Sequence, residues 1–251
     1  MLIIDSHCHA GPGDGFAGPH DTHAPLEKFL QWSLKAGIKK TILFAAFHSD
    51  YLKANAYVAR IVRSNPGRFY GFAFLHAARD KGRIRSMVKM AVREYGFCGL
   101  KIHRYDSPIT REICEVARDF HLPVLYDVMG EVTTVDLLAN EFPDVNFIIP
   151  HLGSFADDWK AQVSFIPVLE RYKNIYTDTS GVRRFDMLEK ALERAGASKI
   201  IFGTDGPWLH PRVELQKILE LGLQEEDLSR VLAKNILSLT AKARSRSGVP
   251  I

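Results

Sequence analysis

Short apolar runs alternate with amphipathic stretches along the whole chain. Each run is rich in aliphatic, β-branched or aromatic residues, which is typical of strands covered on both faces. Because strands that alternate with helices form βαβ units, the pattern predicts a parallel sheet. The predicted strands cover residues 2–7, 40–46, 69–75, 99–103, 123–128, 146–151, 174–179 and 200–204.

The stretch after each run carries apolar residues at helical spacing. Eight strand–helix units in 251 residues leave about 30 residues for each unit, the size of a minimal βαβ repeat. We therefore predict an α/β fold, a (β/α)₈ TIM barrel in one domain over residues 1–251, with an extra C-terminal helical region. The predicted helices cover residues 26–36, 53–62, 84–94, 111–120, 132–141, 163–171, 185–194 and 213–221, followed by 225–242.

Two segments depart from the alternation. Residues 10–24 are rich in glycine and proline, and we expect them to form a mobile lid loop over the barrel mouth. The C-terminal segment 225–251 is expected to hold the extra helix and a tail that is frayed from Arg244 onward.

Composition narrows the class of protein. The chain is 46% hydrophobic and 25% charged, an ordinary globular mix, and its net charge of +4 indicates no nucleic-acid partner and slightly favours an anionic substrate. The three cysteines are sparse and form no CxxC pair, which favours a reducing compartment. No signal peptide or long apolar run is visible, so we expect a cytoplasmic enzyme without a membrane partner.

The clearest chemical motif is the H-x-H pair at the end of the first predicted strand. His7 and His9 point to the same face, about 6.5 Å apart along the strand, and two neutral imidazoles at that spacing can hold a divalent ion. Cys8 points to the opposite face. Asp205 ends the last predicted strand, which barrel closure places beside the first. It is expected either to reach the metal and accept a proton or merely to cap the following turn.

More polar side chains end other predicted strands, where barrels of this kind place their active sites. Lys101 and His103 share one face of a strand, and His151 ends another. A buried lysine is costly unless it is paired or modified, although a rim ion pair would also explain it. A last group is expected to line the substrate pocket or to be ordinary rim residues: His48, His76, Trp208 and His210.

These residues together resemble the amidohydrolase superfamily, in its Amidohydrolase-2 branch, which also contains non-oxidative decarboxylases. The order and spacing of the motifs carry the resemblance over nearly the whole chain. The matching motifs are IDSHCH at 4–9, NPGRFYGF at 65–72, GLKIH at 99–103, FPDVNF at 142–147 with HLG at 151–153, NIYTDTSG at 174–181, FGTD at 202–205 and AKNIL at 233–237.

The resemblance implies a role for each matched residue. His7, His9 and Asp205 would be metal ligands, and Asp205 would also act as a base. His151 would polarise the substrate or activate water, and Lys101 lies where some relatives carry a carboxylated lysine that bridges two metals.

One position departs from the family pattern. The fifth strand motif usually ends in histidine, whereas LPVLYD at 122–127 ends in Asp127. We predict one divalent ion, zinc with manganese or iron as alternatives, held by His7, His9, Asp205 and Asp127. The alternative is that Asp127 does not touch the ion and only hydrogen-bonds a histidine that is itself a metal ligand.

The sequence thus favours a metal-dependent hydrolase that attacks an amide, ester or lactone of a small molecule. A decarboxylase of an aromatic or unsaturated acid is the first alternative. A TatD-like DNase is disfavoured because Gly203 stands where that family has glutamate, and a metal-free binding barrel remains open because of Asp127. A homo-oligomer is compatible with the sequence.

Overall fold

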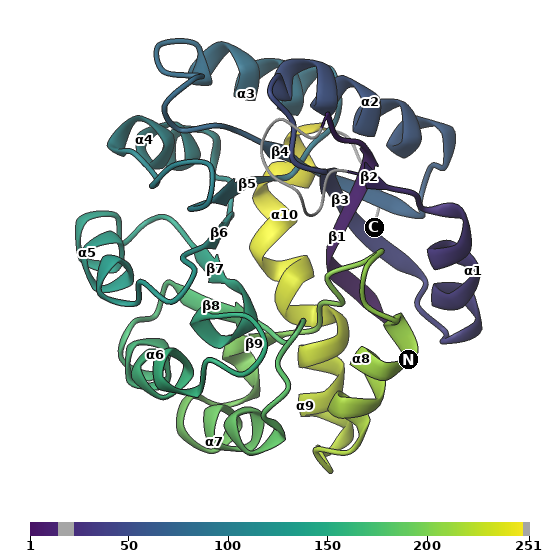
Figure 1. Ribbon diagram of the computed structural model, residues 1–251, viewed down its shortest axis with the longest axis vertical. Coiled ribbons are helices and arrows are strands. Elements are labelled where there is room, and N and C mark those ends of the chain that lie inside the picture. The colour runs from purple at the N-terminus through teal and green to yellow at the C-terminus, as the bar shows by residue number, and fades with distance from the viewer. Residues whose placement is uncertain (15–22, 248–251) are drawn as a thin grey trace.

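The computed structural model describes residues 1–14 and 23–247. A curled nine-stranded sheet forms its centre, with helices packed around the outside (Figure 1). The strands follow one another in the sheet in the order β2-β1-β3-β4-β5-β6-β7-β8-β9, and all adjacent pairs are parallel except β1–β2. The strands are β1 (Ile4–Pro12), β2 (His23–Ala24), β3 (Lys40–Ala45), β4 (Phe69–Phe74), β5 (Gly99–His103), β6 (Val124–Asp127), β7 (Phe147–Ile149), β8 (Ile175–Asp178) and β9 (Ile200–Ile201).

The predicted alternation of parallel strands with helices is confirmed, and the resulting sheet is buried on both faces. Apolar side chains of the helices pack against the outer face of the strands, as the hydrophobic positions along each helix predicted. The helices are α1 (Glu27–Lys35), α2 (Tyr51–Ser64), α3 (Ile84–Arg93), α4 (Arg111–Phe120), α5 (Thr133–Glu141), α6 (Trp159–Arg171), α7 (Phe185–Ala195), α8 (Pro211–Leu219), α9 (Glu225–Ser229) and α10 (Asn235–Ser247). None of the helices in the described ranges is long and apolar enough to cross a membrane.

Hydrogen bonds join the two ends of the parallel series. The backbone N–H of Ser6 donates to the Phe202 carbonyl at 3.0 Å, and the N–H of His9 donates to the Gly206 carbonyl at 2.7 Å. The second of these bonds, with the one from the Gly206 N–H to the His7 carbonyl, forms a parallel bridge between Cys8 and Gly206. β1 is thereby brought against the segment that follows β9.

Helix α10 lies at the end of the sheet where the parallel strands begin, away from the metal ligands. The Arg244 guanidinium lies 5.6 Å from the ring centre of Tyr70, near the start of β4, and its Nε donates to Thr240. Arg244 is only 5% exposed. The expectation of a frayed tail from Arg244 is therefore wrong as far as Ser247, because this arginine is anchored by packing and hydrogen bonds. Residues 248–251 lie outside the described residues.

The two ends of the predicted lid loop lie in strands. β1 continues past His9 because Gly11 and Pro12 pair with Ala24 and His23 in a short antiparallel ladder. Both ends of segment 10–24 therefore belong to strands. The centre of the predicted lid, residues 15–22, lies outside the described residues.

Two predicted strands end two or three residues early, and each is followed by a candidate site residue. β9 stops at Ile201 instead of residue 204, because the N–H of Thr204 donates to the Asp5 carboxylate rather than to a neighbouring strand. β7 stops at Ile149, before a tight turn over Pro150–Gly153. His151 and Asp205 have φ of +59° and +54°, in the left-handed region that non-glycine residues seldom adopt. Such strained backbone is typical of functional sites.

Candidate metal centre

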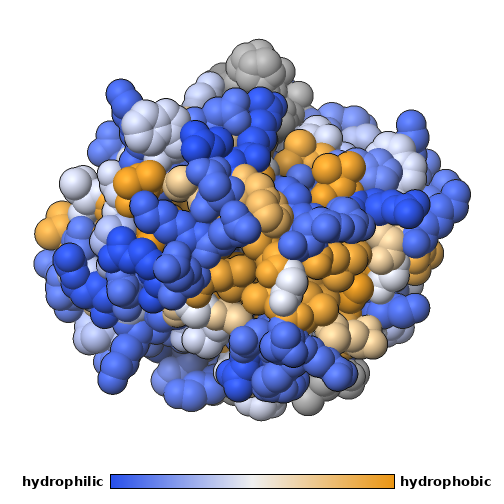
Figure 2. Space-filling model, turned by 90° about the horizontal axis from the view of Figure 1, so that it is seen from below, coloured by the Kyte–Doolittle hydropathy of each residue, from blue (hydrophilic) through white to orange (hydrophobic). Residues whose placement is uncertain are grey.

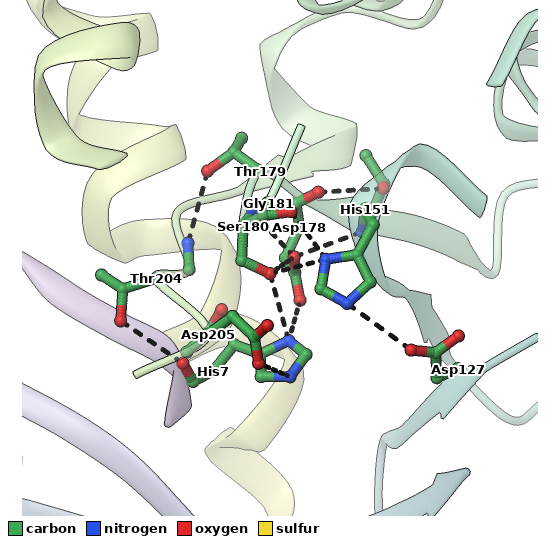
Figure 3. A network of polar contacts seen from close by, with 12 residues as sticks. His7, Asp127, His151, Asp178, Thr179, Ser180, Gly181, Thr204 and Asp205 are labelled. Carbon is green, nitrogen blue, oxygen red and sulfur yellow. Dashed lines mark hydrogen bonds and ion pairs between the residues drawn. The ribbon is translucent and has the colours of Figure 1, made fainter. Parts of the chain in front are cut away.

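His7, His9 and Asp205 come together at one point. Their nearest ligand atoms, imidazole nitrogens and a carboxylate oxygen, all lie within 4.8 Å of one another. The two histidines share a face of β1, as the sequence predicted. Asp205 lies in the segment after β9 that is hydrogen-bonded to β1, a contact here called the join. Asp205, whose backbone is left-handed, directs its side chain toward the ring of His7 (Figure 3).

The donor set fits a divalent ion. The Nδ1 atoms are held by protein acceptors, Asp178 Oδ2 at 2.8 Å from His7 and the Ala45 carbonyl at 2.9 Å from His9. The Nε2 atoms of His7 and His9 lie 3.3 and 3.7 Å from Asp205 Oδ1. Ligands about 2.0–2.1 Å from a tetrahedral zinc are about 3.4 Å apart, so these spacings match a shared ion.

The electrostatic surroundings keep the two imidazoles neutral. Burial, and then the positive charge of Lys101, lower the pKa of His7 below its ordinary value and that of His9 well below it. A neutral imidazole has a free lone pair on the nitrogen that faces the pocket. Both rings are therefore in the protonation state that metal coordination requires.

Asp178 is a functional residue that the sequence interpretation missed. Its carboxylate ends β8, lies fully buried against His7 and also accepts the Ser180 hydroxyl at 2.6 Å. Burial alone would raise the pKa of Asp178, but these partners hold that pKa well below its ordinary value. A carboxylate behind a ligand histidine fixes the ring orientation and strengthens the ligand. The strand-end position that drew attention to Asp205 would have identified Asp178 as well.

A second buried carboxylate, that of Asp5, anchors the turn that carries Asp205. It accepts the backbone N–H of Thr204 at 2.9 Å and the Thr204 hydroxyl at 2.7 Å, and it also accepts the N–H of His7 at 3.1 Å. Burial raises the pKa of Asp5 to about 7 despite these bonds. Asp5 thus ties the two halves of the metal group together.

Asp127 lies apart from this three-residue group. Its Oδ2 is 3.2 Å from His103 Nε2 and 3.5 Å from His151 Nε2, and its Oδ1 accepts the N–H of Met129. The N–H of Tyr105 donates to His103 Nδ1, so in neutral His103 the ring proton is on Nε2 and donates to Asp127. Asp127 therefore pairs with two histidines, neither of which belongs to the three-residue group.

The hydrogen bonds of His151 define its protonation state. Its Nδ1 lies 2.6 Å from the Ser180 carbonyl, which can only accept, and its Nε2 faces the Asp127 carboxylate. Burial disfavours the charged ring, but Asp127 and then the charges of Asp178 and Asp205 raise the pKa of His151 to about 9. His151 is therefore held as an imidazolium, an acid at the edge of the metal group (Figure 3).

Lys101 is fully buried beneath these residues, as its predicted inward position required. Its ammonium lies 5.0 Å from the centre of the Phe44 ring, and its charge acts on both His7 and His9. It supplies positive charge to the floor of the site.

A cavity of about 340 Å³ opens above the metal group. It is lined by most of the predicted site residues and by apolar residues that the sequence interpretation did not select. Trp208, a predicted pocket residue, lies 4.7 Å from His9 between ring centres. The lining residues are His7, His9, Phe47, Lys101, His103, Asp127, Met129, His151, Ser154, Phe155, Asp205, Trp208 and Leu209.

Three predicted pocket residues, His48, His76 and His210, do not line this cavity. The Nδ1 of each accepts a backbone N–H two residues further on, at 2.9, 3.3 and 3.3 Å. His48 and His76 therefore cap turns that follow their strands, whereas His210 caps the N-terminus of α8 and lines a separate cavity beside Val213. Periodicity places such a residue at the rim but cannot tell a capping ring from one that faces the substrate.

Comparison with solved structures shows the same fold. A dihydroxybenzoic acid decarboxylase from Polaromonas, with bound manganese and an inhibitor, has a TM-score of 0.72 at 16% identity, covering 96% of this chain and 97% of that one. A provisionally assigned 2-pyrone-4,6-dicarboxylic acid hydrolase from Pseudomonas putida has a TM-score of 0.72 at 18% identity, covering 96% and 98%. An uncharacterised TIM-barrel protein from Bordetella bronchiseptica has a TM-score of 0.75 at 18% identity, covering 97% and 99%.

No protein of curated function matches the sequence. The family model described as Amidohydrolase, however, matches residues 4–242, nearly the whole chain. This match agrees with the branch to which the motifs point, and the metal group found in the structure comes from those same motifs. The chain therefore belongs to the amidohydrolase family.

Proposed function

We propose that the chain is a single (β/α)₈ barrel domain that acts as a metal-dependent hydrolase on an amide, ester or lactone of a small anionic molecule. The observation that carries this proposal is a pair of groups in opposite states at one pocket. Asp205 offers a carboxylate beside His7 and His9, whereas His151 is held as an imidazolium by Asp127. Hydrolysis needs one group that accepts a proton and one that donates it.

His7, His9 and Asp205 would hold the ion, and zinc suits two imidazoles and a carboxylate. A divalent ion there acts as a Lewis acid on a substrate oxygen and lowers the pKa of water.

Two side chains would carry out the proton transfers, one as the acceptor and one as the donor. Asp205 accepts the proton of the attacking water, because its carboxylate adjoins the two ligand histidines. His151 donates a proton from Nε2 to the leaving group, and the Asp127 carboxylate stabilises the imidazolium until then. Lys101 adds the positive charge that favours an anionic substrate.

A second candidate function is non-oxidative decarboxylation of an aromatic or unsaturated acid. The imidazolium of His151 favours it, because such a reaction needs an acid that protonates carbon and no base for water. The decarboxylase from Polaromonas, which shares the fold and contains manganese, makes that metal the first alternative to zinc.

Elemental analysis of protein purified without added metal tests the metal site. We expect about one divalent ion per chain, lost in His7→Ala. Less than about 0.2 ion per chain, unchanged by His7→Ala, would contradict a metalloenzyme and favour a binding protein.

Product analysis in ¹⁸O-labelled water then separates the two reactions. A panel of lactones and hydroxybenzoates, including 2-pyrone-4,6-dicarboxylate and 2,6-dihydroxybenzoate, is incubated with the zinc and manganese forms. Hydrolysis incorporates the label into a product acid, whereas release of CO₂ together with an unlabelled organic product favours decarboxylation. His151→Gln should keep its metal and lose most of either activity, while Asp205→Asn should lose both metal and activity.

A further inference from the structure

A groove adjoins the metal pocket and shares two side chains with it. Phe155 and Leu209 line the metal pocket and also a second cavity of about 300 Å³, together with Val182 and Val213. Val213 in turn lines a third cavity, of about 660 Å³, beside Phe185. The second and third cavities, here called the side groove, adjoin the metal pocket at Phe155 and Leu209 and extend to helix α8 at the surface.

Most of the exposed wall of the side groove is apolar, and the charged side chains nearest the metal pocket are paired, whereas Arg212 and Glu220 lie at its outer end. Lys217 Nζ donates to Glu214 at 2.8 Å and to the Val182 carbonyl at 2.8 Å, and Arg183 lies 3.4 Å from Asp157. These groups have little left to offer a charged ligand. The groove is therefore suited to an apolar moiety.

The outer end of the side groove is exposed. Val213, on α8, is 61% exposed. Figure 2 shows the face at the foot of Figure 1, to which α8 belongs, with apolar side chains gathered in its middle between hydrophilic ones. Gathered apolar surface of this kind marks binding surfaces more often than scattered apolar residues do.

Phe155 connects the groove to the chemistry. Its ring packs edge-on against His151 with 5.1 Å between ring centres. It also lies directly over Gly181, where an added Cβ would come within 2.3 Å of the ring. A molecule that extends from His151 into the side groove must therefore pass along this ring.

We propose that the side groove binds the apolar arm of an elongated carboxylic acid whose polar head occupies the metal pocket. The inference rests on the proposed function, because it needs an anionic head beside the metal and Lys101. It adds the other half of the substrate, an aliphatic or aryl arm that runs past Phe155 and Leu209 to Val213.

A chain-length series tests the proposal with the zinc-loaded protein. Binding of propanoate, hexanoate and decanoate is measured by isothermal titration calorimetry, and propanoate, too short to reach Val213, reports on the head site in every variant. Each methylene that enters the groove should tighten binding by up to about fourfold. Val213→Asp should abolish the gain from hexanoate to decanoate. Leu219→Asp, on the same helix at a position 45% exposed that does not line the groove, should retain it.

The outcomes separate the two proposals. Equal affinity for the short and long acids, or a gain that survives Val213→Asp, overturns the side groove and leaves the metal site intact. Absence of binding by every acid, while the protein retains its zinc, overturns the anionic head and the side groove together.

Discussion

Each of three site histidines has one ring nitrogen engaged by the protein and the other directed into the pocket. Asp178 holds His7, the Ala45 carbonyl holds His9, and the Ser180 carbonyl holds His151. The residue that faces the other ring nitrogen, Nε2, then determines the role of each histidine. His7 and His9 face Asp205 as neutral ligands, whereas His151 faces Asp127 as an acid.

Asp178→Asn should weaken zinc binding about tenfold to a hundredfold, because the ring of His7 loses the carboxylate that orients it and makes it more basic. Competition with a chromophoric chelator measures the change. The control is Asp157→Asn, at a surface position 66% exposed, which should leave affinity unchanged. Equal affinities of both variants for zinc would show that Asp178 does not support the ligand.

The pair of His151 and Asp127 predicts a pH dependence of stability in the metal-free protein. Folding raises the pKa of His151 from 6.5 to about 9, so the stabilisation is fully present below about pH 6.5 and is lost as pH rises through 9. Urea unfolding at about pH 6 and about pH 9.5 should show this loss, and a smaller loss in Asp127→Asn.

Asp119→Asn, which changes a surface carboxyl beside Arg85, serves as the control for this pH dependence. It should behave like the unmodified chain. An undiminished loss in Asp127→Asn would show that Asp127 does not keep the proton on His151.

Among the elements, the join between β1 and the segment after β9 matters most for the site. It brings residues 7 and 205 together, and the buried contacts of Asp5 with Thr204 hold it. A polar anchor at this point fixes the turn at Asp205 in one conformation, which apolar packing alone would not specify.

Thr204→Val should cost about 1–3 kcal/mol of unfolding free energy, because it removes a hydroxyl donor and leaves the buried Asp5 carboxylate with one partner fewer. Thermal or urea unfolding measures the cost, and zinc affinity should fall with it. Thr110→Val is the matched control, since the buried hydroxyl of Thr110 has no hydrogen-bond partner among the described residues. A cost no larger than that of the control would contradict the anchoring role of Asp5.

For the whole molecule, the candidate ligands come from both ends of the chain. An ion that binds His7, His9 and Asp205 together binds only the folded state, because those positions are far apart in the unfolded chain. Metal binding should therefore stabilise the entire fold.

At a zinc concentration one hundred times its dissociation constant, stability should rise by about 2.7 kcal/mol. For a chain of this size that corresponds to an increase in Tm of about 5–10 °C, which scanning calorimetry with and without chelator would measure. His7→Ala should show no such increase. A Tm independent of zinc in the unmodified protein would argue against a site that spans the join.

The sequence predicted the order and type of most elements, since hydrophobic period is a local property. It also predicted that His7 and His9 share a face and that His151 and Asp205 lie near them, because strand ends meet at one end of such a sheet. Boundaries were less accurate where side chains override the backbone pattern. Thr204 leaves the ladder for Asp5, and Pro150 begins a turn before His151.

What the sequence by itself determined is therefore the alternating architecture and the residue types that collect at its functional end. Only the tertiary structure decided which of them pair. The curled sheet brings Asp178 to His7 across 171 positions, sets Asp127 between two histidines and places Phe155 between the metal pocket and the side groove. The hydrophobic periodicity and the spacing of motif residues describe positions only a few residues apart. These pairings depend instead on the relative positions of strands that are distant in sequence.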